Sequence, residues 1–238
     1  MKNIFGLFLI LCILCACDKT DSDRDHEFEE KVSETVEVSG QTTLFIQGRN
    51  GNITITGTNE TSDISLDITK IVKSRISVSD AESHMSDIFI SIEEETDDIE
   101  VFVDHPLNND IDYTVNFSIT LPLIFDFEIV LGNGNIALES TSRFVTVNLG
   151  NGNTSADLIL LDTCMVEVLT GNGNIELSIP STTNAYLDAS VGNGTVTNTG
   201  LNIQNQVSSG KQITGDIGNG AGTIVLVAGN GNIRIESM

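Results

Sequence analysis

Apolar and polar residues alternate along most of the chain after residue 35, and this period of two is typical of half-buried β-strands. The clearest examples are residues 166–168 (Val-Glu-Val) and 175–179 (Ile-Glu-Leu-Ser-Ile). The same alternation predicts strands near residues 36–38, 44–46, 53–55, 64–68, 88–92, 99–103 and 113–119. One short helix is expected near residues 80–87, because Asp80 can cap it and further acidic residues follow. The pattern therefore predicts an all-β chain with one short helix.

A Gly-Asn-Gly motif recurs between the predicted strands. It begins at residues 132, 150, 171, 192, 218 and 229, in steps of 18, 21, 21, 26 and 11, and a degenerate copy occupies residues 48–53. Gly adopts positive φ without steric cost and Asn tolerates it, so each copy predicts a tight turn. The predicted turn residues are Asn133, Gly134, Asn151, Gly152, Asn172, Gly173, Asn193, Gly194, Asn219, Gly220, Asn230 and Gly231.

Two architectures agree with these turns. An Asn-Gly pair between alternating runs is typical of a β-hairpin, which would give an antiparallel meander. A repeat of near-constant length favours instead a parallel β-solenoid with coils of about 20 residues. In the solenoid, stacked corners would let Asn133, Asn151, Asn172 and Asn193 form a side-chain ladder. The final step of 11 residues would be half a coil that closes the end. Residues 202–211 are polar and are expected to form a loop.

The first 17 residues read as an export signal. A short basic start precedes an apolar run, residues 4–14, which is too short to span a bilayer comfortably. Its end, Leu14-Cys15-Ala16-Cys17, resembles a bacterial lipobox. The resemblance implies cleavage before Cys17 and attachment of acyl chains to that residue, which would anchor the protein stably. The alternative is an ordinary signal peptide that is cut elsewhere.

Composition shifts define three predicted regions. Residues 1–16 are a lipoprotein signal peptide, and residues 17–35 are a flexible tether rich in Asp and Glu. Residues 36–238 are the folded domain, less regular over 36–122 and regularly repeated over 123–238. Acidic residues just after the lipidated Cys resemble signals for the outer surface in some bacteria and for inner-membrane retention in others. We expect an envelope protein, with the outer membrane or cell surface favoured over the periplasmic face of the inner membrane.

Charge and cysteine content limit the function. The chain has 34 acidic and 11 basic residues, a net charge of −23, which argues against nucleic acid as a partner because phosphate contacts need cations. Cys12, Cys15 and Cys17 lie in the leader. Only Cys164 remains in the body, within an apolar strand pattern, and it is expected to be a small buried residue.

The order of these elements resembles the bacterial "putative adhesin" family, which is related to the head domain of autotransporter adhesins of the same provisional name. The resemblance lies in the strand-rich start, the short helix before residues 88–92, Leu121-Pro122, and the copies at Gly132, Gly150, Gly171 and Gly229. It covers residues 36–238. It implies a right-handed β-solenoid and a cell-envelope location, and it carries over no catalytic residue.

Candidate chemistry is sparse. The run from Gly132 to Ala137 matches a dinucleotide fingerprint but is followed by a predicted strand instead of the required helix. The three histidines, His26, His84 and His105, have no partner at metal-ligand spacing. We expect neither an enzyme nor a cofactor. Ca²⁺ at the turns is a weaker alternative, because this sequence has neutral Asn where calcium-binding solenoid repeats have Asp.

The predicted role is presentation of a repetitive strand surface to a glycan, another envelope protein or a host protein. A periplasmic structural or regulatory module shares every feature except surface exposure. A carbohydrate-active enzyme is the third alternative, and it would need clustered carboxylates. The candidates for such a cluster across coils are Asp157, Asp162, Glu167 and Glu176.

Overall fold

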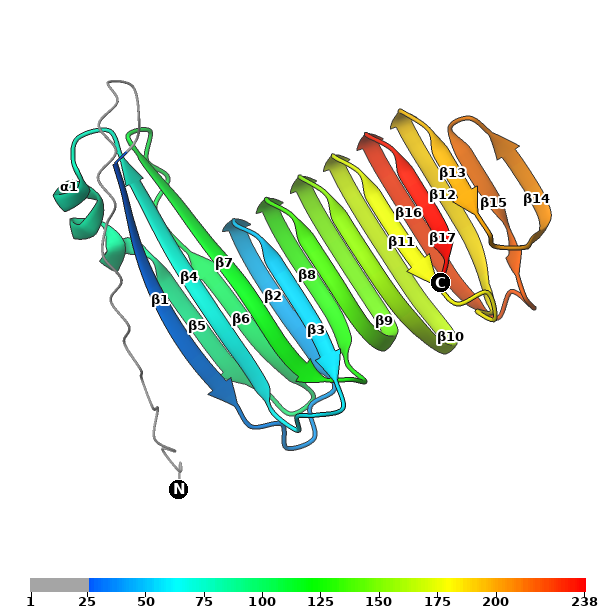
Figure 1. The fold of residues 1–238 in the computed structure, drawn as a ribbon, viewed down its shortest axis with the longest axis horizontal. Helices are drawn as coiled ribbons and strands as arrows, with labels where there is room; N and C mark the ends of the chain where they lie inside the picture. Colours follow the sequence, from blue (N-terminus) through cyan, green and yellow to red (C-terminus); the bar gives the residue numbers. More distant parts are fainter. Residues whose placement is uncertain (1–25) are drawn as a thin grey trace.

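The structure, a computed structural model, describes residues 26–238. The fold is mostly β, with one large mixed sheet of 17 strands, one short α-helix and one 3₁₀ turn (Figure 1). In the N-terminal half the elements are β1 (His26–Val36), β2 (Thr43–Asn50), β3 (Ile53–Thr58), β4 (Ile64–Ser74), α1 (Val78–Ser83), η1 (Met85–Asp87), β5 (Phe89–Glu94), β6 (Asp98–Asp104) and β7 (Ile111–Pro122). The remaining strands are β8 (Asp126–Asn133), β9 (Ile136–Asn151), β10 (Thr154–Asn172), β11 (Ile175–Ile179), β12 (Ala185–Asn193), β13 (Val196–Thr199), β14 (Ile203–Ser209), β15 (Gln212–Ile217), β16 (Gly222–Asn230) and β17 (Ile233–Ser237).

The strand pairings arrange the sheet in two rows, with the long strands β9 and β10 passing from one row to the other. Row one runs β1-β4-β7-β3-β9-β10-β11-β17-β13. Row two runs β5-β6-β2-β8-β9-β10-β16-β12-β15-β14. The middle of each row is parallel, and antiparallel pairs occur only toward the ends. The Gly-Asn-Gly turns in the middle therefore do not join hairpins, because the strands they connect pair with other repeats.

The core lies between the two rows. Alternate residues of each strand point inward, and most of these are Ile, Leu or Val with almost no exposed surface, such as Ile129 and Leu226. Burying a side chain of this size stabilises a fold by about 1.5–3 kcal/mol. One core thus runs through the whole stack of strands.

The order of the repeats in space differs from their order in the chain. The last strand pair, β16 and β17, lies between β10/β11 and β12/β13, so the C-terminus is in the middle of the row (Figure 1). The expectation that the final step of 11 residues closes the end is wrong. The hairpin of β14 and β15 forms the end instead, by antiparallel pairing of β15 with β12.

Three boundaries also differ from the sequence predictions. The predicted tether extends too far, because residues 26–35 belong to β1 and pair along their whole length with β4. Residues 203–209 were expected to be a loop but form β14. Their polar side chains fit a strand at this end of the sheet because all except Ile203 are exposed. The helix begins at Val78, and its N-cap is Ser77, whose hydroxyl accepts a hydrogen bond from the backbone amide of Asp80.

No helix in the described part of the chain is both long enough and apolar enough to cross a membrane.

Candidate functional site

Three features of the described residues are candidates for function: the stacked turns, an apolar line on the outer face of row two, and a groove at the end of the rows near α1. The stacked turns form two columns of side chains. The first column, in spatial order, is Asn50, Asn133, Asn151, Asn172, Asn230 and Asn193. The second is Asn52, Asn135, Asn153, Asn174, Asn232 and Thr195.

Each side-chain amide of the first column after Asn50 donates from Nδ2 to Oδ1 of its neighbour, and Asn50 itself donates to the carbonyl oxygen of Tyr113. The Nδ2 to Oδ1 distances are 2.7–2.8 Å, for example 2.8 Å from Asn151 to Asn133 and 2.7 Å from Asn172 to Asn151. In the second column each Oδ1 also accepts from the backbone amide of the next member, as in Asn153 N to Asn135 Oδ1 at 3.1 Å. These oxygens would be the ligands of a Ca²⁺ ion at the turns, and here they accept hydrogen bonds from the next repeat.

The glycine between the two asparagines is required by close backbone approach. Gly152 has a φ of 136°, and a Cβ on it would lie 1.6 Å from the carbonyl oxygen of Gly134. Gly134, Gly173, Gly194 and Gly231 show the same relation to the glycine of the adjacent repeat, at 1.7–1.9 Å. Any other residue would push the repeats apart, so these glycines set the tight stacking of the turns.

Two predicted turn residues lie outside the columns. Asn219 and Gly220 form a separate turn next to β15, where the amide of Asn219 donates to Oδ1 of Asn184 and Gly220 has a φ of 69°. The Ala221-Gly222 that follows has no Asn to continue the second column. The members of the second column, and Asn50 of the first, were not predicted as site residues, although the second Asn of each Gly-Asn-Gly-Asn copy was the available signal. Cys17, the predicted lipidation residue, lies outside the described residues.

The outer faces of the two rows differ in chemistry. On row two, Phe144, Met165, Thr223 and Tyr186 are in register on adjacent strands. Phe144, Met165 and Tyr186, which we name the exposed line, are 42%, 50% and 43% exposed. On row one the outward residues are mainly polar, for example Ser155 beside Glu176 and Arg234. An apolar line of this kind was not apparent from the sequence, because its members come from three repeats.

The candidate carboxylates are not brought together. Asp157 is outward on row one beside Glu139 and Ser178, and Glu176 lies beside Ser155 on the same face. Glu167 is on row two, and Asp162 lies in the irregular stretch of β10 between the two rows. Among residues 26–238 no three His, Cys, Asp or Glu side chains are placed to hold a metal ion.

The groove lies where row one extends one strand beyond row two. The pairings place β6 and β5 in row two as counterparts of β7 and β4, and no described strand is the counterpart of β1. The helix α1 packs against β1 and β4 and covers part of this position (Figure 1). The rest is a groove of about 380 Å³, which we name the open-end groove, lined by Glu30, Val32, Glu34, Ile68, Lys70, Ile88, Phe89, Ile90 and Ile92.

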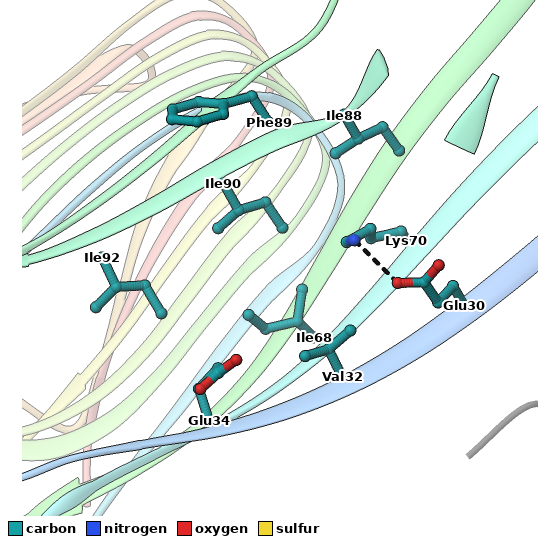
Figure 2. A pocket seen from close by; sticks show the side chains of 9 residues that line it. All are labelled: Glu30, Val32, Glu34, Ile68, Lys70, Ile88, Phe89, Ile90 and Ile92. Atoms are coloured by element: carbon teal, nitrogen blue, oxygen red, sulfur yellow. Dashed lines mark hydrogen bonds and ion pairs between the residues drawn. The ribbon is translucent and has the colours of Figure 1, made fainter. Parts of the chain in front are cut away.

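Apolar side chains face one another across the open-end groove. Figure 2 shows Ile88, Ile90 and Ile92 directed from the β5 side toward Ile68 and Val32, while Phe89 points away. Lys70 donates to Glu30 at 3.0 Å, and their side chains are 19% and 28% exposed. Glu34 adds a second carboxylate, so two acids and one base leave the groove with a net negative charge.

A hydrogen-bonded cluster fixes the elements beside the groove. Oδ2 of Asp87 accepts from the Tyr113 hydroxyl at 2.8 Å and lies 2.7 Å from Nδ1 of His84. The bonds from His84 and Tyr113 lower the pKa of Asp87 below its usual value of 3.8. Desolvation and the adjacent carboxylate raise the pKa of Tyr113 to about 12. The bond from Tyr113 to Asp87 ties η1 to β7, and the Tyr113 ring also stacks on His105, with 5.0 Å between centroids.

Cys164 is the one thiol of the described residues and is buried. It is 2% exposed, as expected for a small core residue, and burial raises the pKa of its thiol. Gly222 of β16 packs directly on it, because a Cβ there would lie 2.6 Å from Sγ. This cysteine is therefore a packing residue where β16 meets β10.

The sequence matches no known protein-family model and no curated protein. The fold is similar to the crystal structure of a "putative cell adhesion protein" from Clostridium sporogenes, with a TM-score of 0.57, 20% identity, and coverage of 90% of this chain and 100% of that one. A "putative adhesin" from Bacteroides fragilis has a TM-score of 0.27, 10% identity, and coverage of 86% and 96%. One from Parabacteroides distasonis has a TM-score of 0.25, 8% identity, and coverage of 87% and 97%.

Proposed function

We propose that this chain is a lipid-anchored, non-enzymatic protein of the bacterial cell envelope that displays a rigid strand surface to a partner. The observation that carries the proposal is the exposed line of Phe144, Met165 and Tyr186, held in register by the stacked repeats. Three large, exposed side chains aligned across four adjacent strands, with Thr223 between Met165 and Tyr186, form a surface on which a partner can pack. The similarity of the fold to that of the "putative cell adhesion protein" from Clostridium sporogenes is compatible with the same role.

The repeats are best described, in this proposal, as coils of a right-handed β-solenoid of about 20 residues each. The in-register pairing of Asn133, Asn151 and Asn172, at separations of 18 and 21 residues, supports this description. Right-handed crossovers are strongly preferred between parallel strands. The two columns of side chains then keep the strand surface rigid, because each Asn in the interior of a column is hydrogen-bonded to the repeats on both sides.

Anchoring through Cys17 is tested in the native bacterium by substitution. A Cys17→Ala protein should lose incorporation of an alkyne-labelled fatty acid and should leave the membrane fraction. Cys164→Ala serves as the matched control, because Cys164 is buried and should leave both readouts unchanged. Label that persists in Cys17→Ala would refute this anchor.

Surface exposure is tested by adding protease to intact cells, with lysed cells as control. Loss of the domain from intact cells is the expected result for an adhesin-like surface protein. Protection in intact cells with digestion after lysis would favour the periplasmic alternative and would exclude direct contact with a host or surface partner.

The contact surface is tested on the purified protein with an immobilised glycan panel. Aromatic side chains stack well on sugar rings, so replacement of Phe144 and Tyr186 by serine should weaken any binding at least tenfold. A matched pair on row one, Ser155→Ala with Thr197→Ala, should bind as the parent does. Equal binding by both pairs would place the contact elsewhere.

A further inference from the structure

We infer that the open-end groove binds an extended, cationic segment of a partner protein, which adds as a strand to the free edge of β5. This interaction goes beyond surface display and depends neither on the lipid anchor nor on the exposed line. It rests on three observations: an unfilled strand position, an unprotected edge, and apolar side chains with net negative charge.

The strand position is defined by the two rows. β1 has an inward face that contributes Val32 to the groove, but no described strand covers it. Row two stops at β5, which pairs only with β6 among the described strands. A segment beside β5 would cover Val32 in the same way that β5 and β6 cover the next strands of row one, where Ile68 of β4 is already buried. The six residues of β5 span about 20 Å, which sets the length of a matching segment.

The edge of β5 lacks the usual protection. Free strand edges are blunted by charged residues, prolines, bulges or inward-pointing charges. β1 follows this rule, with five acidic or basic residues among Glu27 to Lys31 and Glu34. β14, at the other end of row two, has a register shift between Gln204 and Val207. β5 has acids only at its end, and its Ile90 and Ile92 face the groove. Its free backbone groups can therefore pair with an incoming strand.

The chemistry of the groove selects the occupant. Alternate apolar side chains of an extended segment would pack on the partly exposed Val32, Ile90 and Ile92. A lysine or arginine on the same face would meet Glu34 and Glu30, which outnumber Lys70. A second copy of this chain is disfavoured, because each copy has a net charge of −23. The eight residues before β1, Asp-Lys-Thr-Asp-Ser-Asp-Arg-Asp, contain no apolar side chain and do not match either.

The test uses defined peptides and the full mature protein. The probes are labelled eight-residue peptides in which Val alternates with Thr and one Val is replaced by Lys, at each of the four positions in turn. Fluorescence anisotropy should show saturable binding of at least one peptide, at least tenfold tighter than its Glu counterpart. N-methylation of the backbone amides along one edge of that peptide should abolish binding, whereas methylation along the other edge should not.

Two protein variants place the interaction in the groove. Val32→Asp should weaken binding at least tenfold, and Val207→Asp, on the exposed β14 at the other end, should not. Glu34→Lys should reverse the preference from the Lys peptide to the Glu peptide, which keeps the test valid if Val32→Asp folds poorly.

Several results would overturn the inference. These are no saturation by any peptide below about 1 mM, equal binding after either methylation, or unchanged binding to Val32→Asp. Sedimentation that reveals a dimer, abolished by Val32→Asp, would assign the groove to a second copy instead. Saturable binding of palmitate, weakened by Val32→Asp, together with no peptide binding would make it a site for a small apolar ligand.

Discussion

Asn230 donates from its Nδ2 to Oδ1 of Asn172 at 2.7 Å, although 58 residues separate them in the chain. Asn193, which comes between them in sequence, donates to Asn230 in turn at 2.8 Å. The C-terminal repeat is thus inserted into the column between two earlier repeats. β16 joins β10 to β12, and β17 joins β11 to β13, so both rows depend on the last residues of the chain.

Deletion of residues 222–238 should therefore disorder more than the deleted part. β12 would lose its parallel partner and β13 its only described partner, so residues 185–217 should become protease-sensitive. Limited proteolysis with mass spectrometry would locate the new cleavage sites. Replacing the end hairpin, residues 203–217, by a short linker is the control and should leave residues 126–179 and 222–237 protected. Protection of residues 185–199 after the C-terminal deletion would contradict this role of the inserted repeat.

Gly152→Ala should prevent native stacking of the turns. The added Cβ would lie 1.6 Å from a carbonyl oxygen, at a φ of 136° that Ala strongly disfavours. We expect a loss of more than about 3 kcal/mol in the free energy of unfolding, measured by urea denaturation. Gly210→Ala is the matched control, because nothing lies within 4 Å of its Cβ position, and a change within about 0.5 kcal/mol is expected.

Asn151→Ala should remove two side-chain hydrogen bonds of the first column. Asn151 donates to Asn133 and accepts from Asn172, and each exposed hydrogen bond contributes about 0.5–1 kcal/mol. A destabilisation of about 1–2 kcal/mol is expected in urea denaturation. Asn59→Ala, in an exposed turn, is the control, since its side chain makes no hydrogen bond within the described part of the chain. Equal unfolding free energies for the two variants would mean that hydrogen bonds to water replace those of Asn151 without destabilising the fold.

Asp87→Asn should destabilise the protein in a pH-dependent way. The folded-state pKa of Asp87 is lowered, so its stabilising effect is present above the ordinary value of 3.8 and is lost as pH falls through the folded value. The difference in unfolding free energy between parent and variant should be about 1 kcal/mol at pH 6, because the side chain is 35% exposed, and should shrink as pH falls through the folded value. Asp97→Asn, in an exposed turn, supplies the control substitution.

Cys164 should react slowly with a thiol reagent in the folded protein. Burial both shields the sulfur and raises its pKa, which lowers the thiolate fraction. In a chain of residues 18–238, where it is the single cysteine, labelling should become fast only in denaturant. Fast labelling under native conditions would mean that β16 separates readily from β10. An exposed position in β14, Ser208→Cys in a Cys164→Ala background, supplies the rate of an accessible thiol.

Local chemistry made part of this molecule predictable. The alternating pattern predicted the strands, since one face of each is buried, and the spacing of Asn133, Asn151 and Asn172 matches their stacking in the first column. The position of Asn230 was beyond prediction for a physical reason. Every Gly-Asn-Gly-Asn copy offers the same donors, acceptors and glycine, so the motif itself does not specify which copies become neighbours.

The groove and the exposed line depend on relations between distant strands. The groove exists because β1 extends row one by one strand, and nothing in residues 26–36 alone reveals that row two stops earlier. The acidic composition of residues 26–35 indicated a tether. These residues form β1 instead, because they pair with β4 and direct Phe28, Val32 and Val36 inward. Phe144, Met165 and Tyr186 likewise become neighbours only through the register of four strands.

The inserted repeat also has a consequence for the order of synthesis. A ribosome makes residues 222–238 after the repeats on either side of them, and a chain that crosses a membrane from its N-terminus would deliver them after those repeats. Until they arrive, β12 has no parallel neighbour to complete its ladder, and β10 lacks one side of its own. The two rows therefore become continuous only after residues 222–238 have emerged, which delays compaction of the repeats on either side.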